Sequence, residues 1–279
     1  MWIWIVIGAA ALLALAGLIE AARLRYIGIE IEDAKIPEAF DGMRMVFASD
    51  IHYGRNVMKA SVKKTVANIN ALEPDYILLG GDYTEGLPYQ TEKAFGILSG
   101  LKAKYGIYGV IGNHDIAAGK NEIIDAMKKA GIEPLVNDGV LLTHKGQSIA
   151  LCGVDDMMFG EPNISRALRN TKADYVIALS HNPDYIEDIA IIRDDFKGPN
   201  VDFVFAGHTH GGQITFFNKF ALMNANALGE KYRTGYKEHK GIKMYVSNGT
   251  GTSVLPFRFF SRPDMLVITL KHKEEAKPQ

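Results

Sequence analysis

The sequence predicts an α/β fold, built from mixed β-structure covered by helices and preceded by one transmembrane helix. Between residues 43 and 130, short apolar runs alternate with amphipathic segments of helical length. Further along, the apolar runs continue with fewer helices between them, which indicates a mixed sheet, or two sheets packed together. The first 19 residues carry no charged side chain.

The N-terminal run MWIWIVIGAAALLALAGLI would span roughly 28 Å as a helix, close to the apolar thickness of a bilayer. Glu20, Arg23 and Arg25 end the run. A cleaved signal peptide is the alternative, but it would carry basic residues before a shorter apolar core. We therefore predict an uncleaved single-pass anchor over residues 1–25. The two arginines favour a cytoplasmic position for the rest of the chain.

The rest of the chain is predicted to form one domain, residues 26–270, followed by a solvated tail, 271–279. After Tyr26 the sequence shows no second transmembrane run, low-complexity block or internal repeat. Strand-like apolar runs occupy residues 43–50, 75–82, 106–115, 148–156, 174–183, 201–212, 242–251 and 265–271. Helices are expected over residues 58–72, 92–101 and 122–130, and a long polar loop over 224–241.

Composition limits the classes of function. A chain of 279 residues, 47% of them hydrophobic, is long enough to bury a large core. Lys and Arg total 31 against 32 Asp and Glu, so no overall field favours nucleic acid, and none is predicted as a partner. The single cysteine, Cys152, cannot form an internal disulfide and is expected to be buried as a small apolar residue.

Metal-compatible side chains stand at the ends of five apolar runs. The five segments are Asp50-Ile51-His52, Gly81-Asp82, Gly112-Asn113-His114-Asp115, Ser180-His181-Asn182-Pro183 and Gly207-His208-Thr209-His210, and they contain five of the eight histidines. Each segment alone is typical of a turn or a helix cap. The carboxyl ends of strands converge at one edge of a layered α/β fold, however, so these distant residues can meet in one site.

The residue types indicate the kind of metal site. Strand alternation would turn Asp50 and His52 to one side, and His208 and His210 likewise. Two carboxylates, one amide and four or five imidazoles without a thiolate suit Mn, Fe, Zn or Co and disfavour calcium. Seven ligands are too many for one four- or five-coordinate ion but suit two ions, if one carboxylate bridges them. Two divalent ions, two aspartates and a bridging hydroxide leave about one positive charge, which suits attack on a phosphate ester. A histidine that is not a ligand could protonate the leaving group.

The ordered series Asp-x-His, Gly-Gly-Asp, Gly-Asn-His-Asp, His and Gly-His-x-His resembles the calcineurin-like metallophosphoesterase superfamily. The resemblance runs from residue 50 to residue 210 and implies two mixed sheets packed as a sandwich flanked by helices. It also implies seven metal ligands: Asp50, His52 and His210 for one ion, Asn113, His181 and His208 for the other, and Asp82 bridging both. His114 matches the family's general acid, and Asp115 is a candidate for orienting it.

The N-terminal segment, GHTHGGQ, YVSNGTG and RPDMLVITL are similar to the bacterial membrane-associated branch of the superfamily. That branch implies hydrolysis of a phosphodiester or pyrophosphate, with a membrane lipid or a precursor such as a UDP-diacylglucosamine-like molecule among the candidate substrates. A broad phosphomonoesterase or a cyclic-nucleotide phosphodiesterase is the alternative. A catalytically inactive scaffold is disfavoured, because all seven ligands and His114 are present. Glu85 stands where purple acid phosphatases carry a tyrosine, which argues against a tyrosinate-ferric centre.

Three further segments can each be interpreted in two ways. Aromatic residues alternate with Lys219, Arg258 and Arg262 in FFNKF (216–220) and LPFRFFSRP (255–263). These segments are interpreted either as core packing with solvated cations or as an amphipathic rim that rests on lipid headgroups. The basic and aromatic residues of 231–240 are either solvated or in contact with the rest of the substrate. Gly211 and Gly212 are expected to leave room for the substrate.

Overall fold

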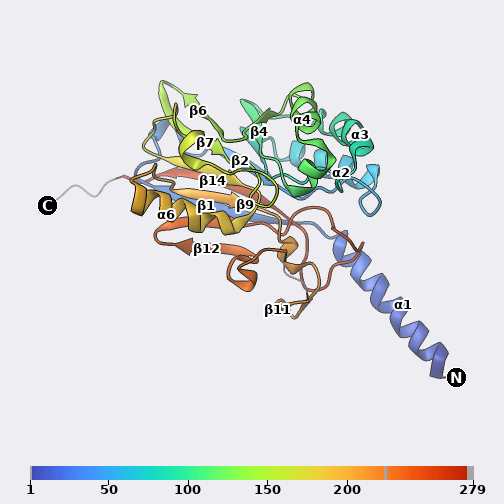
Figure 1. The fold of residues 1–279 in the computed structure, drawn as a ribbon. Helices are drawn as coiled ribbons and strands as arrows, with labels where there is room; N and C mark the ends of the chain where they lie inside the picture. Colours follow the sequence, from blue (N-terminus) through green and yellow to red (C-terminus); the bar gives the residue numbers. More distant parts are fainter. Residues whose placement is uncertain (1, 223–224, 275–279) are drawn as a thin grey trace.

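The computed structural model describes residues 2–222 and 225–274. Two six-stranded sheets lie face to face, helices cover their outer faces, and α1 (Trp2–Ala21) projects away from the domain (Figure 1). The predicted sandwich of two mixed sheets is therefore confirmed. Helix α1 has 20 residues, and an 18-residue stretch of it has a mean hydropathy of 2.4, so it is long and apolar enough to cross a membrane.

The first sheet contains four parallel neighbours and two strands from the ends of the chain. Its order is β1 (Arg25–Asp33), β14 (Asp264–His272), β2 (Arg44–Ala48), β3 (Tyr76–Leu79), β4 (Gly106–Gly109) and β5 (Glu133–Pro134). Strand β14 runs antiparallel to β2 and parallel to β1. The predicted tail, 271–279, thus begins inside β14, and residues 275–279 lie outside the described residues.

The second sheet places four parallel strands between two antiparallel edge strands. Its order is β12 (Gly235–His239), β13 (Ile242–Val246), β9 (Phe203–Ala206), β8 (Val176–Ser180), β7 (Gln147–Gly153) and β6 (Asp138–His144). The expected loop over 224–241 is wrong in its second half, because β12 pairs with β13 through a turn at Lys240 and Gly241. Both turn residues have positive φ, as a tight hairpin requires.

Strand alternation divides the apolar side chains between the interior and the outer layers. In β2, Met45 and Phe47 face the second sheet, and the ring of Phe47 stacks on Phe205 with centroids 5.5 Å apart. Val46 and Ala48 face the opposite way, toward a layer of three helices. That layer consists of α2 (Lys59–Ala71), α3 (Pro88–Leu98) and α4 (Asn113–Lys129). The outer face of the second sheet packs on α5 (Ile164–Ala167) and α6 (Ile186–Phe196) and buries the Cys152 side chain there.

The short elements lie near the ends of the strands. They are η1 (Glu38–Phe40), η2 (Pro183–Tyr185), η3 (His210–Gly212), η4 (Gly229–Tyr232) and a hairpin formed by β10 (Thr215–Phe216) and β11 (Phe220–Ala221). Helix α4 begins nine residues earlier than the predicted helix over 122–130, so the Asn-His-Asp motif forms its first turn. Gly119, at φ 120°, interrupts the helix between the motif and the predicted part.

Candidate metal centre

The fold brings all seven predicted ligands to one edge of the sandwich. Strands β2, β3 and β4 are parallel neighbours, and so are β8 and β9, so the segments that follow them meet at their carboxyl ends. Three overlapping groups of side chains have ligand atoms within 4.8 Å of one another: Asp50, His52 and His210; His52, Asp82 and His114; and Asp82, His181 and His208. Asn113 joins the third group through its amide oxygen, 3.2 Å from His181 Nε2.

The backbone aims these side chains in a way that the sequence did not predict. Strand alternation was expected to pair them, but β2 ends at Ala48 and β9 at Ala206, before the ligands begin. Five ligands instead have left-handed backbone: Asp50, His52, Asp82, His208 and His210, with φ between 49° and 70°. Such a conformation costs a non-glycine residue roughly 1–3 kcal/mol and persists only where the surroundings fix it. Here the Asp50 and His52 N–H groups donate to the carbonyls of Gly81 and Asp82, both at 3.0 Å.

One half of the site holds several hydrogen-bond acceptors that face one another. His181 Nδ1 must donate to the Gly80 carbonyl at 2.7 Å, and His208 Nε2 must donate to the Ala225 carbonyl at 3.2 Å. When both rings are neutral, the remaining nitrogen of each carries a lone pair, and these two nitrogens lie 3.2 Å apart. Asp82 Oδ2 lies 3.3 Å from His181 Nε2. Lone pairs this close repel one another unless a cation lies between them, so the donor set fits a metal ion.

The other half of the site contains Asp50, His52 and His210. The Nε2 atoms of His52 and His210 lie 3.0 Å apart, and His52 Nε2 lies 3.4 Å from Asp82 Oδ2. The Asp82 carboxylate therefore stands between the two halves, where a bridging ligand would stand. Among the described residues, the buried Nδ1 of His52 has no hydrogen-bond partner.

The charges of the cluster suit cations. Burial lowers the pKa of His52 to about 3 and that of His208 to about 4, so both rings are neutral near pH 7 and can bind metal. Burial also lowers the pKa of His181, but the Asp82 carboxylate outweighs burial and raises it to about 10. Without a metal ion, His181 therefore carries a second proton near pH 7, and a bound divalent ion would supply positive charge beside Asp82 in place of that proton.

A match to a protein-family model identifies the family of this chain. A model of the calcineurin-like phosphoesterases matches residues 43–212, which include every predicted ligand. The chain belongs to the calcineurin-like phosphoesterase family. The family relies on two divalent metal ions and comprises metal-dependent phosphoric ester hydrolases, the enzyme class that the motifs predicted.

Relatives of this phosphoesterase cover most of its length. The "transmembrane protein with metallophosphoesterase domain" of Danio rerio is 31% identical over 94% of this chain, and the match spans 61% of that protein. The "uncharacterized metallophosphoesterase YkuE" of Bacillus subtilis is 30% identical over 86% of this chain and 83% of its own length. A Bos taurus protein, also named a transmembrane protein with this domain, is 27% identical over 93% of the chain and 60% of its own.

The two predicted catalytic residues of the phosphoesterase differ in their contacts. His114 is half-buried and faces the cavity, and its backbone N–H donates to Asp82 Oδ1 at 2.9 Å. Asp115 is buried, and its carboxylate accepts the N–H groups of Asp82 (2.7 Å), Tyr83 (2.9 Å) and Gly112 (3.0 Å). Within the described chain, no hydrogen bond joins Asp115 to the His114 ring. The contacts of Asp115 therefore fix the loop that carries Asp82.

Arg258 was not predicted as part of the site; it was interpreted either as a solvated cation beside packed aromatic residues or as part of an amphipathic rim on lipid headgroups. The side chain is fully buried, and all five of its N–H groups donate to backbone carbonyls, including that of His210 at 3.0 Å. Burial lowers the pKa of Arg258 to about 10, so the guanidinium stays charged near pH 7. Its position among six aromatic and apolar neighbours in LPFRFFSRP was the only signal in the sequence.

Two expectations about loops change. A Cβ at Gly211 would clash with Asn248, and one at Gly212 would clash with Ala221, so both glycines permit close packing of loops, and Gly212 also lines the cavity. The basic and aromatic residues of 231–240 do not line the described cavity. Tyr232, for example, is buried and donates to Glu187 at 2.7 Å.

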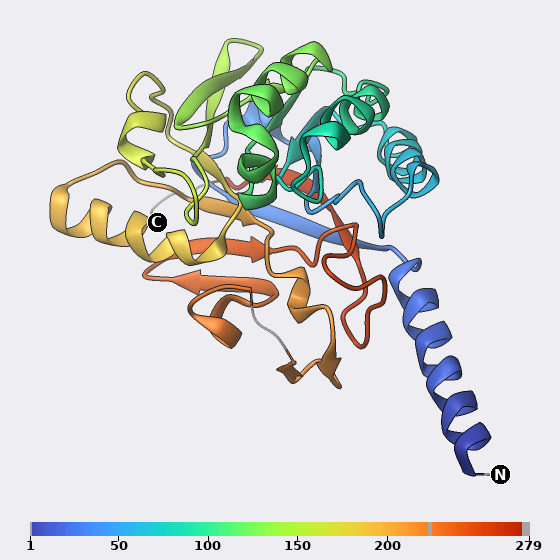
Figure 2. The same cartoon turned by 45° about the vertical axis from the view of Figure 1, so that its right-hand side comes forward.

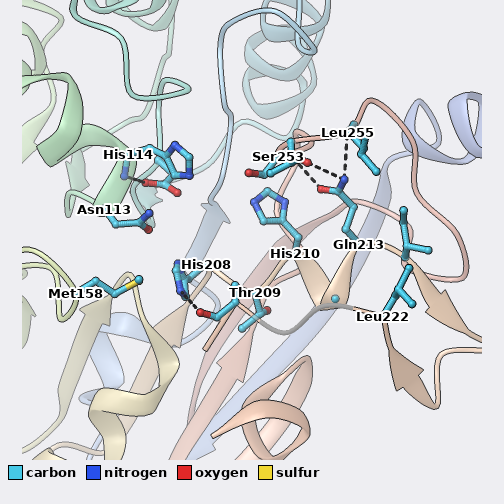
Figure 3. A pocket seen from close by; sticks show the side chains of 15 residues that line it. Asn113, His114, Met158, His208, Thr209, His210, Gln213, Leu222, Ser253 and Leu255 are labelled. Carbon is cyan, nitrogen blue, oxygen red and sulfur yellow. Dashed lines mark hydrogen bonds between the residues drawn. The ribbon is translucent and has the colours of Figure 1, made fainter. Parts of the chain in front are cut away.

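The metal cluster opens into a cavity of about 290 Å³ (Figure 3). Asn113, His114, His208 and His210 lie on its polar side. Four apolar side chains, Ile214, Leu222, Val254 and Leu255, also line the cavity and form its apolar wall. In Figure 3, Leu222 and Leu255 lie beside Gln213 and Ser253, while Met158 lies on the side of Asn113 and His208. A phosphate group bound at the ligands would therefore have a hydrophobic surface within reach of its substituent.

Proposed function

We propose that the chain is a membrane-anchored enzyme that hydrolyses a phosphodiester or a pyrophosphate with two divalent metal ions. The observation that carries the proposal is the set of acceptors on His208, Asn113 and Asp82 that face His181 Nε2, because this set favours a positive charge among them and divalent ions would supply it. The proposed ligands are Asp50, His52 and His210 for one ion, Asn113, His181 and His208 for the other, and Asp82 for both. When bound, the ions supply positive charge to the phosphoryl oxygens and lower the pKa of a coordinated water.

The protein's own residues supply positioning and a proton. His114 lies beside the cluster, with its ring centroid 4.8 Å from that of His52, and it faces the cavity without a place in the two proposed ligand sets. We assign it the donation of a proton to the leaving oxygen. Asp115 acts indirectly, as a positioning residue that fixes the backbone of Asp82.

The apolar wall supports a substrate with a hydrophobic substituent. Ile214, Leu222, Val254 and Leu255 would contact it beside the bound phosphate. A membrane lipid, or a lipid precursor such as a UDP-diacylglucosamine-like molecule, combines a phosphate ester or anhydride with such a substituent. The anchor would keep the site close to substrates of this kind.

Hydrolysis of bis(p-nitrophenyl) phosphate tests the metal-dependent activity. The purified full chain, stripped of metal and reloaded with Mn²⁺, is expected to hydrolyse the ester. Asp82→Ala should reduce kcat/KM by at least about 100-fold, because both ions lose a shared ligand. Asp125→Ala, on the exposed side of α4, should have no effect. Retained activity in Asp82→Ala would contradict the assignment.

A comparison of substrates tests the narrower proposal. The anchored enzyme is expected to have a higher kcat/KM for lipid-linked pyrophosphates than for soluble diesters, monoesters and cyclic nucleotides, because the apolar wall contacts only the first class. Equal or better turnover of the soluble esters would remove the lipid proposal and leave the metal site standing.

A further inference from the structure

The β10–β11 hairpin exposes an unusual amount of aromatic surface. Phe216, Phe217 and Phe220 are 67%, 60% and 67% exposed, so they are not part of the core. The exposed Lys219 lies in the turn between them. Large apolar side chains beside a lysine are typical of segments that rest in the headgroup layer of a membrane.

A neighbouring loop, residues 253–262, contacts α1 inside its apolar run. The backbone N–H of Arg258 donates to the Gly17 carbonyl at 3.1 Å, and a Cβ on Gly17 would lie only 2.7 Å from Phe257 Cβ. Gly17 is the one buried residue in the described helix. It precedes Ala21, the last residue of the helix, by four positions, or about 6 Å along the axis. If α1 crosses a bilayer, this loop therefore lies at the level of its outermost layer.

The hairpin is attached to this loop. The Thr215 N–H donates to the Phe259 carbonyl at 2.9 Å, and the rings of Phe217 and Phe260 lie 4.7 Å apart. In Figures 1 and 2 the hairpin projects from the same side of the domain as α1, with the loop between them. The anchor, the loop and the hairpin thus present one side of the molecule together.

The same side leads into the catalytic cavity. Leu222 follows β11 and Val254 belongs to the loop, and both are 76% exposed while they also line the cavity. These two residues therefore connect the hairpin and the loop to the cavity that His208 and His210 line.

We infer that the apolar rim, defined as Phe216, Phe217, Phe220, Leu222, Val254 and Phe260, inserts into the surface of the bilayer that α1 spans. The cavity then opens at the membrane surface and accepts phosphate esters whose hydrocarbon part remains in the lipid. Lys219 contacts anionic headgroups at the same level. This inference rests on the anchoring proposed above.

Fluorescence quenching tests the contact directly. The full chain carrying Phe217→Cys is labelled with an environment-sensitive dye and reconstituted in vesicles of phosphatidylcholine and phosphatidylglycerol. The native thiol does not interfere, since Cys152 is buried and burial raises its pKa. The control is Phe196→Cys, 74% exposed at the end of α6. Spin-labelled lipid should quench the dye at 217 and leave the dye at 196 unchanged. Equal emission at 217 with and without spin-labelled lipid would overturn the inference.

A combined substitution of Phe216, Phe217 and Phe220 by Ser tests the consequence for catalysis. These side chains do not line the cavity, so hydrolysis of a soluble diester should stay within about twofold, while that of a phosphate ester held in vesicles should fall at least about tenfold. Phe196→Ser is the matched control. Unchanged turnover in vesicles, or equal loss on both substrates, would contradict the inference. If the unaltered enzyme hydrolysed neither ester, the proposed function would fail, and the quenching result would still decide the membrane contact.

Discussion

At the scale of single residues, the site depends on the backbone groups that hold its side chains. The carbonyls of Gly80 and Ala225 determine which nitrogens of His181 and His208 are free. The Asp115 carboxylate holds three N–H groups around Asp82. These two carbonyls belong to residues that are not predicted ligands. They act indirectly, by fixing the tautomers of His181 and His208, which are predicted ligands.

Replacement of Asp115 tests its positioning role. Asp115→Ala leaves three buried N–H groups without acceptors, which should lower the free energy of unfolding by about 3 kcal/mol and metal affinity by about 10–100-fold. Asp115→Asn keeps one acceptor oxygen and should recover part of both. Denaturant unfolding and metal titration measure these effects, with Asp125→Ala as the exposed control in the same helix. Normal metal affinity in Asp115→Ala would show that the loop does not need the carboxylate.

The sequence predicted the residue types of the site better than their geometry. Asp50, His52 and His210 were identified from motifs, and the structure brings them together. Their left-handed backbone was not predictable from strand periodicity, because it is fixed by hydrogen bonds to a segment 31 residues away in the sequence, such as Asp50 N–H to the Gly81 carbonyl. The role of Asp115 was missed for the same reason.

At the scale of elements, the loop around Arg258 links the anchor to the metal centre. The backbone of Arg258 contacts Gly17 in α1, and its guanidinium contacts the carbonyl of His210 in η3. The same guanidinium binds the carbonyls of Asn248, Gly251 and Ser261. One side chain therefore fixes the relative positions of three segments.

Substitution of Arg258 by Met should be strongly destabilising. Four buried carbonyls would each lose their hydrogen bonds to the guanidinium, at a cost of about 3 kcal/mol or more, and the affinity of the site that contains His210 should fall. The matched control is Arg262→Met, since Arg262 is only half-buried and binds one carbonyl, that of Arg23. Thermal unfolding of both variants makes the comparison. An equal and small effect would mean that Arg258 does not brace the loop.

Prediction of the elements was most accurate where periodicity was local. Helix α2 (Lys59–Ala71) lies within one residue of its predicted ends. Strand β1 was not predicted, although YIGIEIE alternates as an edge strand should, because it contains no continuous apolar run. Strand β12 was taken for a loop because its polar residues GYKEH become a strand only through pairing with β13.

At the scale of the whole molecule, α1 stands apart from the domain, and only 6% of its apolar 18-residue stretch is buried. An unburied helix of this composition needs an apolar environment, which agrees with the predicted anchor. The sequence was sufficient for the family and for the sandwich, since the motifs stand in a fixed order at strand ends. It could not show that the apolar rim and the cavity share the side from which α1 projects, because that depends on tertiary packing.

Cell fractionation tests the anchor. If α1 is the uncleaved anchor that we propose, the full chain should stay with the membrane after an alkaline wash and retain Trp2 in the mature protein. Mass spectrometry of the membrane fraction measures this. A soluble chain that begins after residue 21 would show that the segment is a signal peptide.

The metal content of the full chain tests the central claim most directly. After chelation, reloading with Mn²⁺ and removal of free ions, elemental analysis is expected to find two ions per chain, since we assign the seven proposed ligands to two sets that share Asp82. His181→Ala should remove the ion bound with Asn113 and His208 and leave the other. A content of one ion or fewer in the unaltered chain, under conditions that saturate its activity, would contradict the dinuclear site.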